Sequence, residues 1–142
     1  MPEKILLVDD EKEFVEALAE RMRARDMDVT AVTTAKDALD KADADNYDAI
    51  ILDLQMPEMD GIEALKRIKA KHPDMQIILL TGHATVEKSV TAMKLGAMDL
   101  LEKPMDIETL TEKIKQAHDQ RMLLVEKATE EKIQEIIGVK GW

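Results

Sequence analysis

The sequence predicts one α/β domain built on a five-stranded parallel sheet with helices on both faces. Three observations predict this fold class. Short apolar runs alternate with segments of helical apolar spacing up to about residue 118. Three of these runs are apolar without interruption, which is typical of strands buried on both faces. A chain of 142 residues also leaves room for only one domain of ordinary size.

Five runs of about four residues are the expected strands. Residues 5–8, 49–52 and 77–80 are continuously apolar, as in the interior of a parallel sheet. Residues 29–32 and 98–101 are as short but less uniform. Their brevity favours strands over buried helices, which need ten or more residues as a rule.

Between the runs, apolar residues recur at the i, i+3, i+4 spacing of a helix that lies on a sheet. Residues that typically flank helices agree with this spacing, since Asp60-Gly61 precedes the third predicted helix and Pro73 follows it. Strand followed by helix five times over predicts right-handed parallel crossovers. The five stripes are Phe14, Val15, Leu18 and Met22; Ala35, Ala38, Leu39 and Ala42; Ile62, Leu65 and Ile68; Val86, Val90, Met93 and Leu95; and Ile107, Leu110, Ile114 and Ala117.

The pattern changes at about residue 119. We expect residues 1–118 to form the domain and residues 119–142 to form a helical tail that extends the fifth helix. The polar stretch 126–132 interrupts the apolar spacing, so a long coiled coil is not expected. We favour a tail used in self-association or docking; a cover for the body and the start of a linker are the other interpretations.

The composition excludes several function classes. Thirty acidic and twenty basic residues give a net charge of -10, which disfavours direct binding to nucleic acid or to a membrane surface. The chain has no cysteine, so disulfides and thiolate metal sites are excluded. No signal peptide and no apolar run long enough to span a membrane is visible, and we expect a cytoplasmic protein.

Polar side chains follow four of the five predicted strands. Asp9 and Asp10 come after the first, Asp53 after the third, Thr81 after the fourth and Lys103 after the fifth. Ligands of open parallel sheets bind beyond the carboxyl ends of the strands. In the flavodoxin-like strand order 2-1-3-4-5, these five side chains would meet in one shallow pocket.

The composition of this pocket predicts phosphoryl chemistry with a metal ion. Three neighbouring carboxylates repel one another unless a cation joins them, and an all-oxygen ligand set points to Mg²⁺. Asp53, at the centre of the sheet, is the best placed nucleophile toward a phosphoryl group. Lys103 would neutralise developing charge and Thr81 would donate a hydrogen bond to a phosphoryl oxygen.

Four short motifs carry these residues: Asp9-Asp10; Asp53-Leu54-Gln55-Met56-Pro57 with Met59-Asp60-Gly61; Thr81-Gly82; and Lys103-Pro104. In this order and spacing they resemble the receiver domain of two-component response regulators. The resemblance covers residues 4 to about 118.

The resemblance implies that Asp53 accepts a phosphoryl group from the phosphohistidine of a sensor histidine kinase. Mg²⁺ would be held by Asp10, Asp53 and the backbone carbonyl of Gln55, with Asp9 assisting through water. The family pattern also implies a cis peptide bond between Lys103 and Pro104. Phosphorylation would draw Thr81 inward and change the face formed by the fourth helix, the fifth strand and the fifth helix. That face would signal to a downstream protein or an output domain, or would form a homodimer, as the tail helix also could.

Two positions depart from the family pattern. Leu100 stands where the family usually has an aromatic switch residue, and Met105 where it often has Phe. We therefore expect phosphorylation to be intact and the aromatic readout to be weakened or replaced. His83 and Gln55 are candidates for tuning the access of water to the acyl phosphate. For His83, an exposed loop histidine without such a role is the alternative interpretation, and the sequence does not favour one over the other.

The alternative function is a phosphohydrolase of the haloacid-dehalogenase type. That chemistry needs a second Asp two residues after the nucleophile, where this chain has Gln55, and its acidic metal-binding pair comes late in the chain. We therefore expect a switch that catalyses only its own phosphotransfer and dephosphorylation. It would be a stand-alone regulator, a phosphorelay intermediate or an excised receiver.

Overall fold

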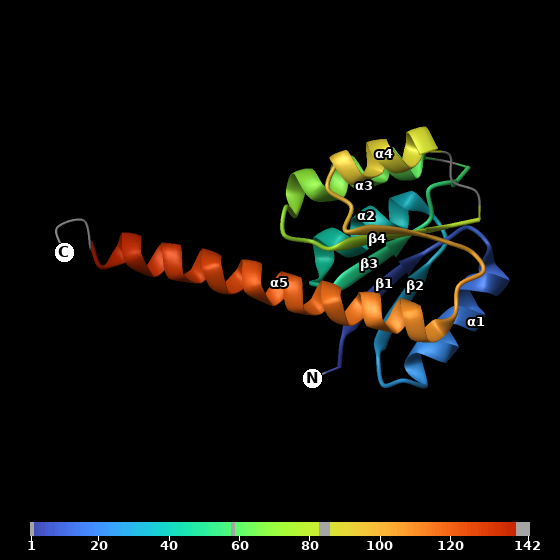
Figure 1. The fold of residues 1–142 in the computed structure, drawn as a ribbon, viewed down its shortest axis with the longest axis horizontal. Coiled ribbons are helices and arrows are strands. Elements are labelled where there is room, and N and C mark those ends of the chain that lie inside the picture. The colour runs from blue at the N-terminus through green and yellow to red at the C-terminus, as the bar shows by residue number, and fades with distance from the viewer. Residues whose placement is uncertain (1, 58, 83–85, 139–142) are drawn as a thin grey trace.

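The computed structural model describes residues 2–57, 59–82 and 86–138 of the chain, and all statements below refer to these residues. Five strands and five helices alternate along the chain (Figure 1). The strands are β1 (Lys4–Val8), β2 (Asp28–Val32), β3 (Ala49–Leu52), β4 (Ile77–Thr81) and β5 (Asp99–Glu102). The helices are α1 (Lys12–Arg23), α2 (Ala35–Ala44), α3 (Gly61–Lys71), α4 (Val86–Lys94) and α5 (Ile107–Ile136).

All strand pairs are parallel, and the strand order is β2-β1-β3-β4-β5. The predicted fold class and strand order are therefore confirmed. The order reverses between β1 and β3, which lie side by side with Ile5 opposite Ala49 and Val8 opposite Leu52. Open parallel sheets bind ligands beyond the carboxyl ends of the strands at the point where the strand order reverses.

The sheet separates two hydrophobic cores because alternate strand residues point to opposite faces. On one face, Leu6, Ile50 and Leu79 pack against α2, α3 and α4. On the other face, Leu7, Ile51 and Ile78 pack against α1 and α5. Figure 1 shows these two helical layers on either side of the sheet. The three continuously apolar runs thus serve both cores at once.

The stripe of α4 is oriented differently from the prediction. Val86, Val90 and Met93 were expected to face the sheet, but they are 82%, 47% and 45% exposed. The buried residue of α4 is Ala92, whose small side chain lets the helix backbone approach the core. Of the predicted stripe, only Leu95, just beyond the helix, packs against the core.

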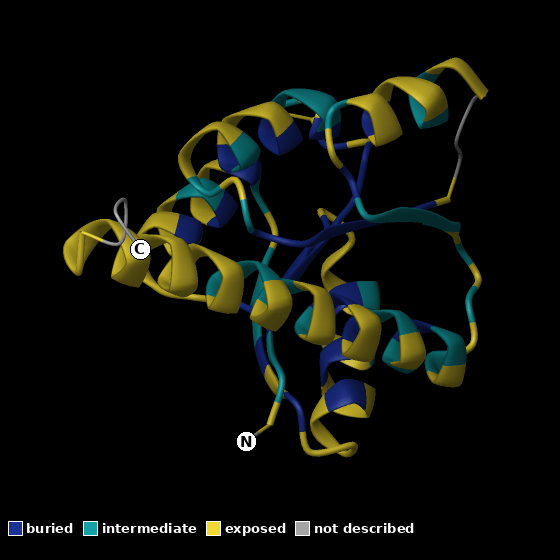
Figure 2. Cartoon of the chain, turned by 60° about the vertical axis from the view of Figure 1, so that its left-hand side comes forward, coloured by how far each residue is buried: buried dark blue, intermediate teal, exposed yellow. Residues whose placement is uncertain are grey.

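Helix α5 continues without interruption past residue 118 and projects away from the body (Figures 1 and 2). Its buried residues, Leu110, Ile114 and Ala117, all lie in its N-terminal half. The extended C-terminal helix is therefore as predicted, whereas the division of the chain into units 1–118 and 119–142 stays a prediction. In the part of the chain that is described, no helix is long and apolar enough to cross a membrane.

A cluster around Asp48 fastens α5 to the body at the end of the sheet opposite the strand-end carboxylates. Asp48 is buried, and its Oδ2 accepts a hydrogen bond of 2.8 Å from the backbone N–H of Lys4. Its Oδ1 lies 2.7 Å from Nδ1 of His118 and 3.8 Å from a guanidinium nitrogen of Arg121. One carboxylate thus connects β1, the residue before β3 and the middle of α5.

We expect Asp48→Asn to lower the free energy of unfolding by about 2 kcal/mol, the scale of hydrogen bonds to a buried charged group. Asp45→Asn is the matched control, because Asp45 forms an exposed ion pair with Lys4 and such pairs contribute little. Urea unfolding followed by circular dichroism measures both variants. An equal loss in the two would show that the Asp48 cluster is not an anchor.

Candidate functional site

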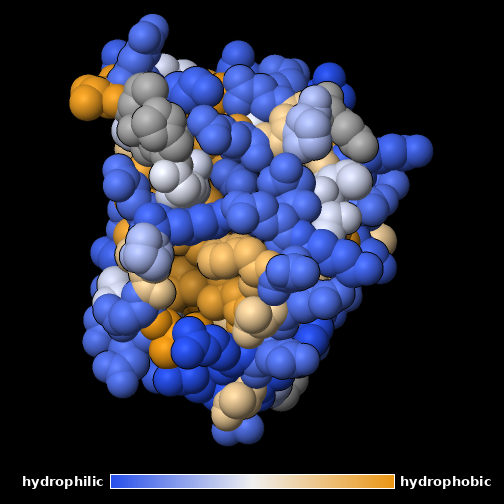
Figure 3. Space-filling model, turned by 90° about the vertical axis from the view of Figure 1, so that its right-hand side faces the viewer, coloured by the Kyte–Doolittle hydropathy of each residue, from blue (hydrophilic) through white to orange (hydrophobic). Residues whose placement is uncertain are grey.

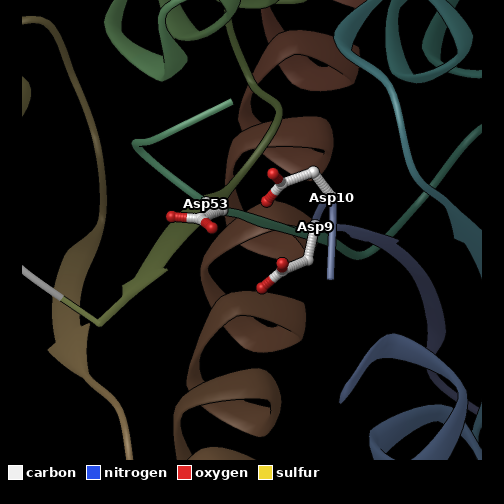
Figure 4. Close-up of side chains that lie close together, drawn as sticks. All are labelled: Asp9, Asp10 and Asp53. Carbon is white, nitrogen blue, oxygen red and sulfur yellow. The ribbon is translucent and has the colours of Figure 1, made fainter. Parts of the chain in front are cut away.

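The site lies at the carboxyl edge of the sheet, because parallel strands all end there. Asp9 and Asp10 follow β1, Asp53 follows β3, Thr81 ends β4 and Lys103 comes after β5. Each of the three aspartates places a carboxylate oxygen within 4.8 Å of the others. Figure 4 shows the carboxylates converging from the ends of two neighbouring strands.

The turns after β1 and β3 are held by the aspartates themselves. Oδ1 of Asp9 accepts the backbone N–H of Glu11 at 2.9 Å, and Oδ1 of Asp53 accepts that of Gln55 at 3.0 Å. Both side chains are buried, whereas Asp10 is exposed. The backbone N–H of Asp53 also donates to the carbonyl of Val8, which joins the two turns.

Helix α3 begins directly behind Asp53 because Gly61 has no side chain. The N–H of Gly61 donates to the carbonyl of Leu54 at 2.9 Å. A Cβ at this position would lie 2.5 Å from the carbonyl oxygen of Asp53 and 2.5 Å from Cα of Leu54. The side chain of Asp60 caps the helix by accepting the N–H of Ile62. The Asp60-Gly61 pair read from the sequence as a helix start therefore also shapes the site.

The ammonium of Lys103 is enclosed by acidic groups. Its Nζ lies 2.5 Å from Oδ2 of Asp9, 3.0 Å from Oε1 of Glu11 and 3.7 Å from Oδ2 of Asp53. The ring centroid of Phe14 lies 4.2 Å away. The Lys103 side chain is only 12% exposed.

Burial and charge act in opposite directions on this pair. Burial lowers the pKa of Lys103, but the carboxylates of Asp9 and Glu11 outweigh it and the net shift is upward. Burial raises the pKa of Asp9, and this outweighs the hydrogen bond from Lys103 that lowers it. The pKa of Asp9 is raised because the single ammonium of Lys103 does not offset the cost of burying the charged carboxylate. A second cation beside Asp9 would further stabilise its charged form.

An open depression of about 600 Å³ lies over the carboxylates. Thr81 is fully buried beneath this edge, and its backbone carbonyl accepts the N–H of Lys103 at 2.8 Å. The lining residues are Asp10, Glu11, Asp53, Leu54, Gln55, Met56, Pro57, Asp60, Gly82 and Lys88. The site can therefore admit a small anionic group together with a metal ion.

The remaining predicted residues are placed as follows. Gln55 is exposed at the depression, and Leu100 is partly buried on the β5 side of the core beneath α4. The Lys103–Pro104 peptide bond is cis, as the resemblance implied. Met105 packs on the α1–α5 core rather than on the α4 side. His83 lies outside the described residues.

Sequence reasoning missed Glu11, Phe14 and Lys88. Glu11 adjoins the Asp9-Asp10 pair, and this adjacency was a usable signal. Phe14 was assigned to the apolar stripe of α1, which is correct but does not predict its contact with Lys103. Lys88 lies in the first turn of α4, and no spacing connects it to the strand ends.

The family model for the response regulator receiver domain matches residues 5–115. The chain belongs to this family. Receiver domains are phospho-accepting signalling switches, and this function is the one that the matches support. They give no support to the phosphohydrolase alternative.

Curated relatives of this receiver domain are transcriptional regulators. The protein FixJ of Bradyrhizobium diazoefficiens is 37% identical over 113 residues, which are 80% of this chain and 55% of that protein. The protein ZraR of Salmonella typhimurium is also 37% identical over 113 residues, 80% of this chain and 26% of that protein. The chain thus spans between about a quarter and about half of these relatives.

Solved structures agree with the receiver fold. A receiver domain protein of Methanospirillum hungatei superposes with a TM-score of 0.82 at 29% identity and covers 86% of this chain and 98% of its own. A receiver domain protein of Clostridium thermocellum gives 0.81 at 30% identity, with the same coverage. Receiver domains bind Mg²⁺ at an acidic pocket, and the cluster of Asp9, Asp10 and Asp53 in this receiver has the oxygen donors that Mg²⁺ prefers.

Proposed function

We propose that this chain accepts a phosphoryl group on Asp53 from a sensor histidine kinase in a Mg²⁺-dependent reaction. The observation that carries the proposal is the convergence of three carboxylates with the Lys103 ammonium, which lies 3.7 Å from Oδ2 of Asp53. The nucleophile, the metal ligands and a charge-neutralising group are then all within reach of one phosphorus atom.

In the proposed reaction, a carboxylate oxygen of Asp53 attacks the phosphorus of the kinase phosphohistidine. The new O–P bond forms as the P–N bond breaks, and the imidazole leaves with its electron pair and is then protonated. Asp10, Asp53 and the carbonyl of Gln55 would hold Mg²⁺, with Asp9 assisting through water. The bound ion supplies Lewis-acid neutralisation of the phosphoryl oxygens.

Lys103 and Thr81 would act on the product. Lys103 would form an ion pair with one phosphoryl oxygen, and the hydroxyl of Thr81 would donate to another. Movement of Thr81 would then be transmitted to Leu100 and α4, since Leu100 packs beneath α4. Gln55, and by the resemblance His83, would tune the access of water to the acyl phosphate.

The proposed output surface is the α4-β5-α5 face. Its support is the exposed apolar stripe of Val86, Val90 and Met93 on α4. The partner would be a downstream protein, an output domain or a second copy of the chain, and the exposed tail of α5 offers a second surface for a copy. We propose no turnover of external substrates and no direct contact with nucleic acid.

The test is phosphorylation by phosphoramidate, followed by intact-protein mass spectrometry. Wild-type protein is expected to gain one phosphoryl group with Mg²⁺ and none with EDTA. Asp10→Asn should raise the Mg²⁺ concentration for half-maximal rate at least about tenfold, since even outer-shell partners of a bound metal contribute that much.

Asp60→Asn is the matched control for Asp10→Asn. It removes the same charge from the same depression, and Asn still caps a helix. Labelling in EDTA, or the same Mg²⁺ requirement in both variants, would contradict the proposed metal site.

A further inference from the structure

The Lys103 ammonium is bounded by an aromatic ring as well as by carboxylates. Its Nζ lies 4.2 Å from the ring centroid of Phe14, within the range of a cation–π contact. The chain has one Phe, one Tyr and one Trp. One of three aromatic side chains therefore lies against the lysine of the site.

The carboxylates around Lys103 do not by themselves hold it near Asp53. The shorter contacts run to Asp9 and Glu11, at 2.5 and 3.0 Å, and Asp53 is the most distant at 3.7 Å. The Glu11 side chain is 65% exposed, so its attraction draws the Lys103 ammonium toward solvent. A contact that restrains the ammonium without forming an ion pair would oppose this pull and leave the charge available to a phosphoryl group.

Phe14 is itself held by packing. It lies in the first turn of α1 and packs against the core between the sheet, α1 and α5. It also lines a hollow of about 170 Å³ between α1 and α5. Figure 3 shows this hydrophobic hollow surrounded by hydrophilic side chains. The other lining residues are Ala17, Leu18, Arg21, Leu80, Met105 and Leu110. Phe14 thus packs on the apolar core, borders this hollow and contacts the Lys103 ammonium.

We propose that Phe14 is a positioning residue for phosphoryl transfer, which holds the ammonium of Lys103 within reach of Asp53. This inference rests on the proposed phosphorylation of Asp53. The ring presents its negative face to the ammonium, satisfies part of its charge and adds no competing anion. As negative charge develops on the phosphoryl oxygens, the ammonium is then already close to where it is needed.

The experiment compares three variants in the phosphoramidate assay. Phe14→Leu keeps an apolar side chain on the hollow but removes the ring face. Phe14→Tyr keeps the ring face that contacts the ammonium. Leu18→Met is the matched packing control, because Leu18 lines the same hollow one helical turn further along α1.

We expect Phe14→Leu to slow phosphorylation about threefold to tenfold, the range of a partly desolvated cation–π contact. Phe14→Tyr and Leu18→Met should stay near the wild-type rate. In proton NMR of the wild type, the ε-methylene of Lys103 should show an upfield ring-current shift. Phe14→Leu should lose this shift and Phe14→Tyr should keep it.

The proposal is overturned if Phe14→Leu phosphorylates at the wild-type rate, or if all three variants slow equally, which would show a packing role. It is also overturned if wild-type Lys103 shows no ring-current shift, a measurement that needs no variant to fold. A wild type that is not phosphorylated at all would instead contradict the proposed function, so the two failures are distinguishable.

Discussion

Asp53→Asn is expected to abolish labelling by phosphoramidate while leaving the fold intact. The amide has nearly the shape of the carboxylate and can still accept the N–H of Gln55, but it has no anionic oxygen to attack phosphorus. The free energy of unfolding should change little, because the variant removes the repulsion between Asp53 and Asp9 together with the attraction between Asp53 and Lys103. Phosphorylation is measured by intact mass, and the modified residue is mapped by peptide mass spectrometry after borohydride reduction of the acyl phosphate.

The control for this variant is Asp60→Asn, which should be labelled like the wild type. Stoichiometric labelling of Asp53→Asn would contradict the assignment of the acceptor. Loss of labelling together with a lower unfolding midpoint would leave the fold, not the nucleophile, as the cause. Urea unfolding of both variants is therefore part of the measurement.

Gly61→Ala is expected to lower the free energy of unfolding by about 2–3 kcal/mol, the cost of overpacking a well-packed site. The new Cβ would lie 2.5 Å from backbone atoms of Asp53 and Leu54, which cannot move aside as a flexible side chain can. The same shift would displace Asp53 and slow its phosphorylation. The sign is informative, because Gly→Ala in an unstrained helical position normally stabilises a protein.

Gly82→Ala is the matched control on the other side of the depression. The nearest atom to a Cβ there is Cδ of Lys103, 4.0 Å away. We expect little change in stability from this substitution. Equal effects of the two substitutions, measured by urea unfolding, would refute the close approach of α3 to Asp53.

The sheet could be predicted from the sequence because burial on both faces leaves a direct mark. Runs such as 49–52 and 77–80 are apolar at every position, and the observed strand bounds differ from the predicted ones by at most one residue at either end. The strand-end positions of Asp9, Asp53 and Lys103 follow from the same runs. Parallel topology then places these side chains at one edge without any knowledge of contacts.

The orientation of α4 could not be predicted in this way. Helical spacing identifies the apolar stripe of Val86, Val90 and Met93, but it does not say which side of a helix will pack. In α4 the small Ala92 allows the closest approach to the sheet, and the larger side chains remain outside. An exposed apolar stripe of this kind can be recognised only once the structure shows which residues form the core.

Contacts between distant parts of the chain were equally hidden. Lys103 meets Glu11 and Phe14 across about ninety residues, and His118 meets Asp48 across seventy. Each residue has an ordinary local explanation as part of a charged surface or an apolar stripe. Only the three-dimensional arrangement shows that the Phe14 ring and the exposed Glu11 carboxylate both contact the Lys103 ammonium.

The projecting part of α5 affects how the chain unfolds. Every residue between 126 and 136 is exposed, so almost no tertiary packing opposes the conformational entropy of this segment. Its helicity depends on local hydrogen bonds and on propagation from the anchored turns that precede it. Helix and coil therefore interconvert gradually along the tail, fraying from its far end, while the body unfolds in a single cooperative transition.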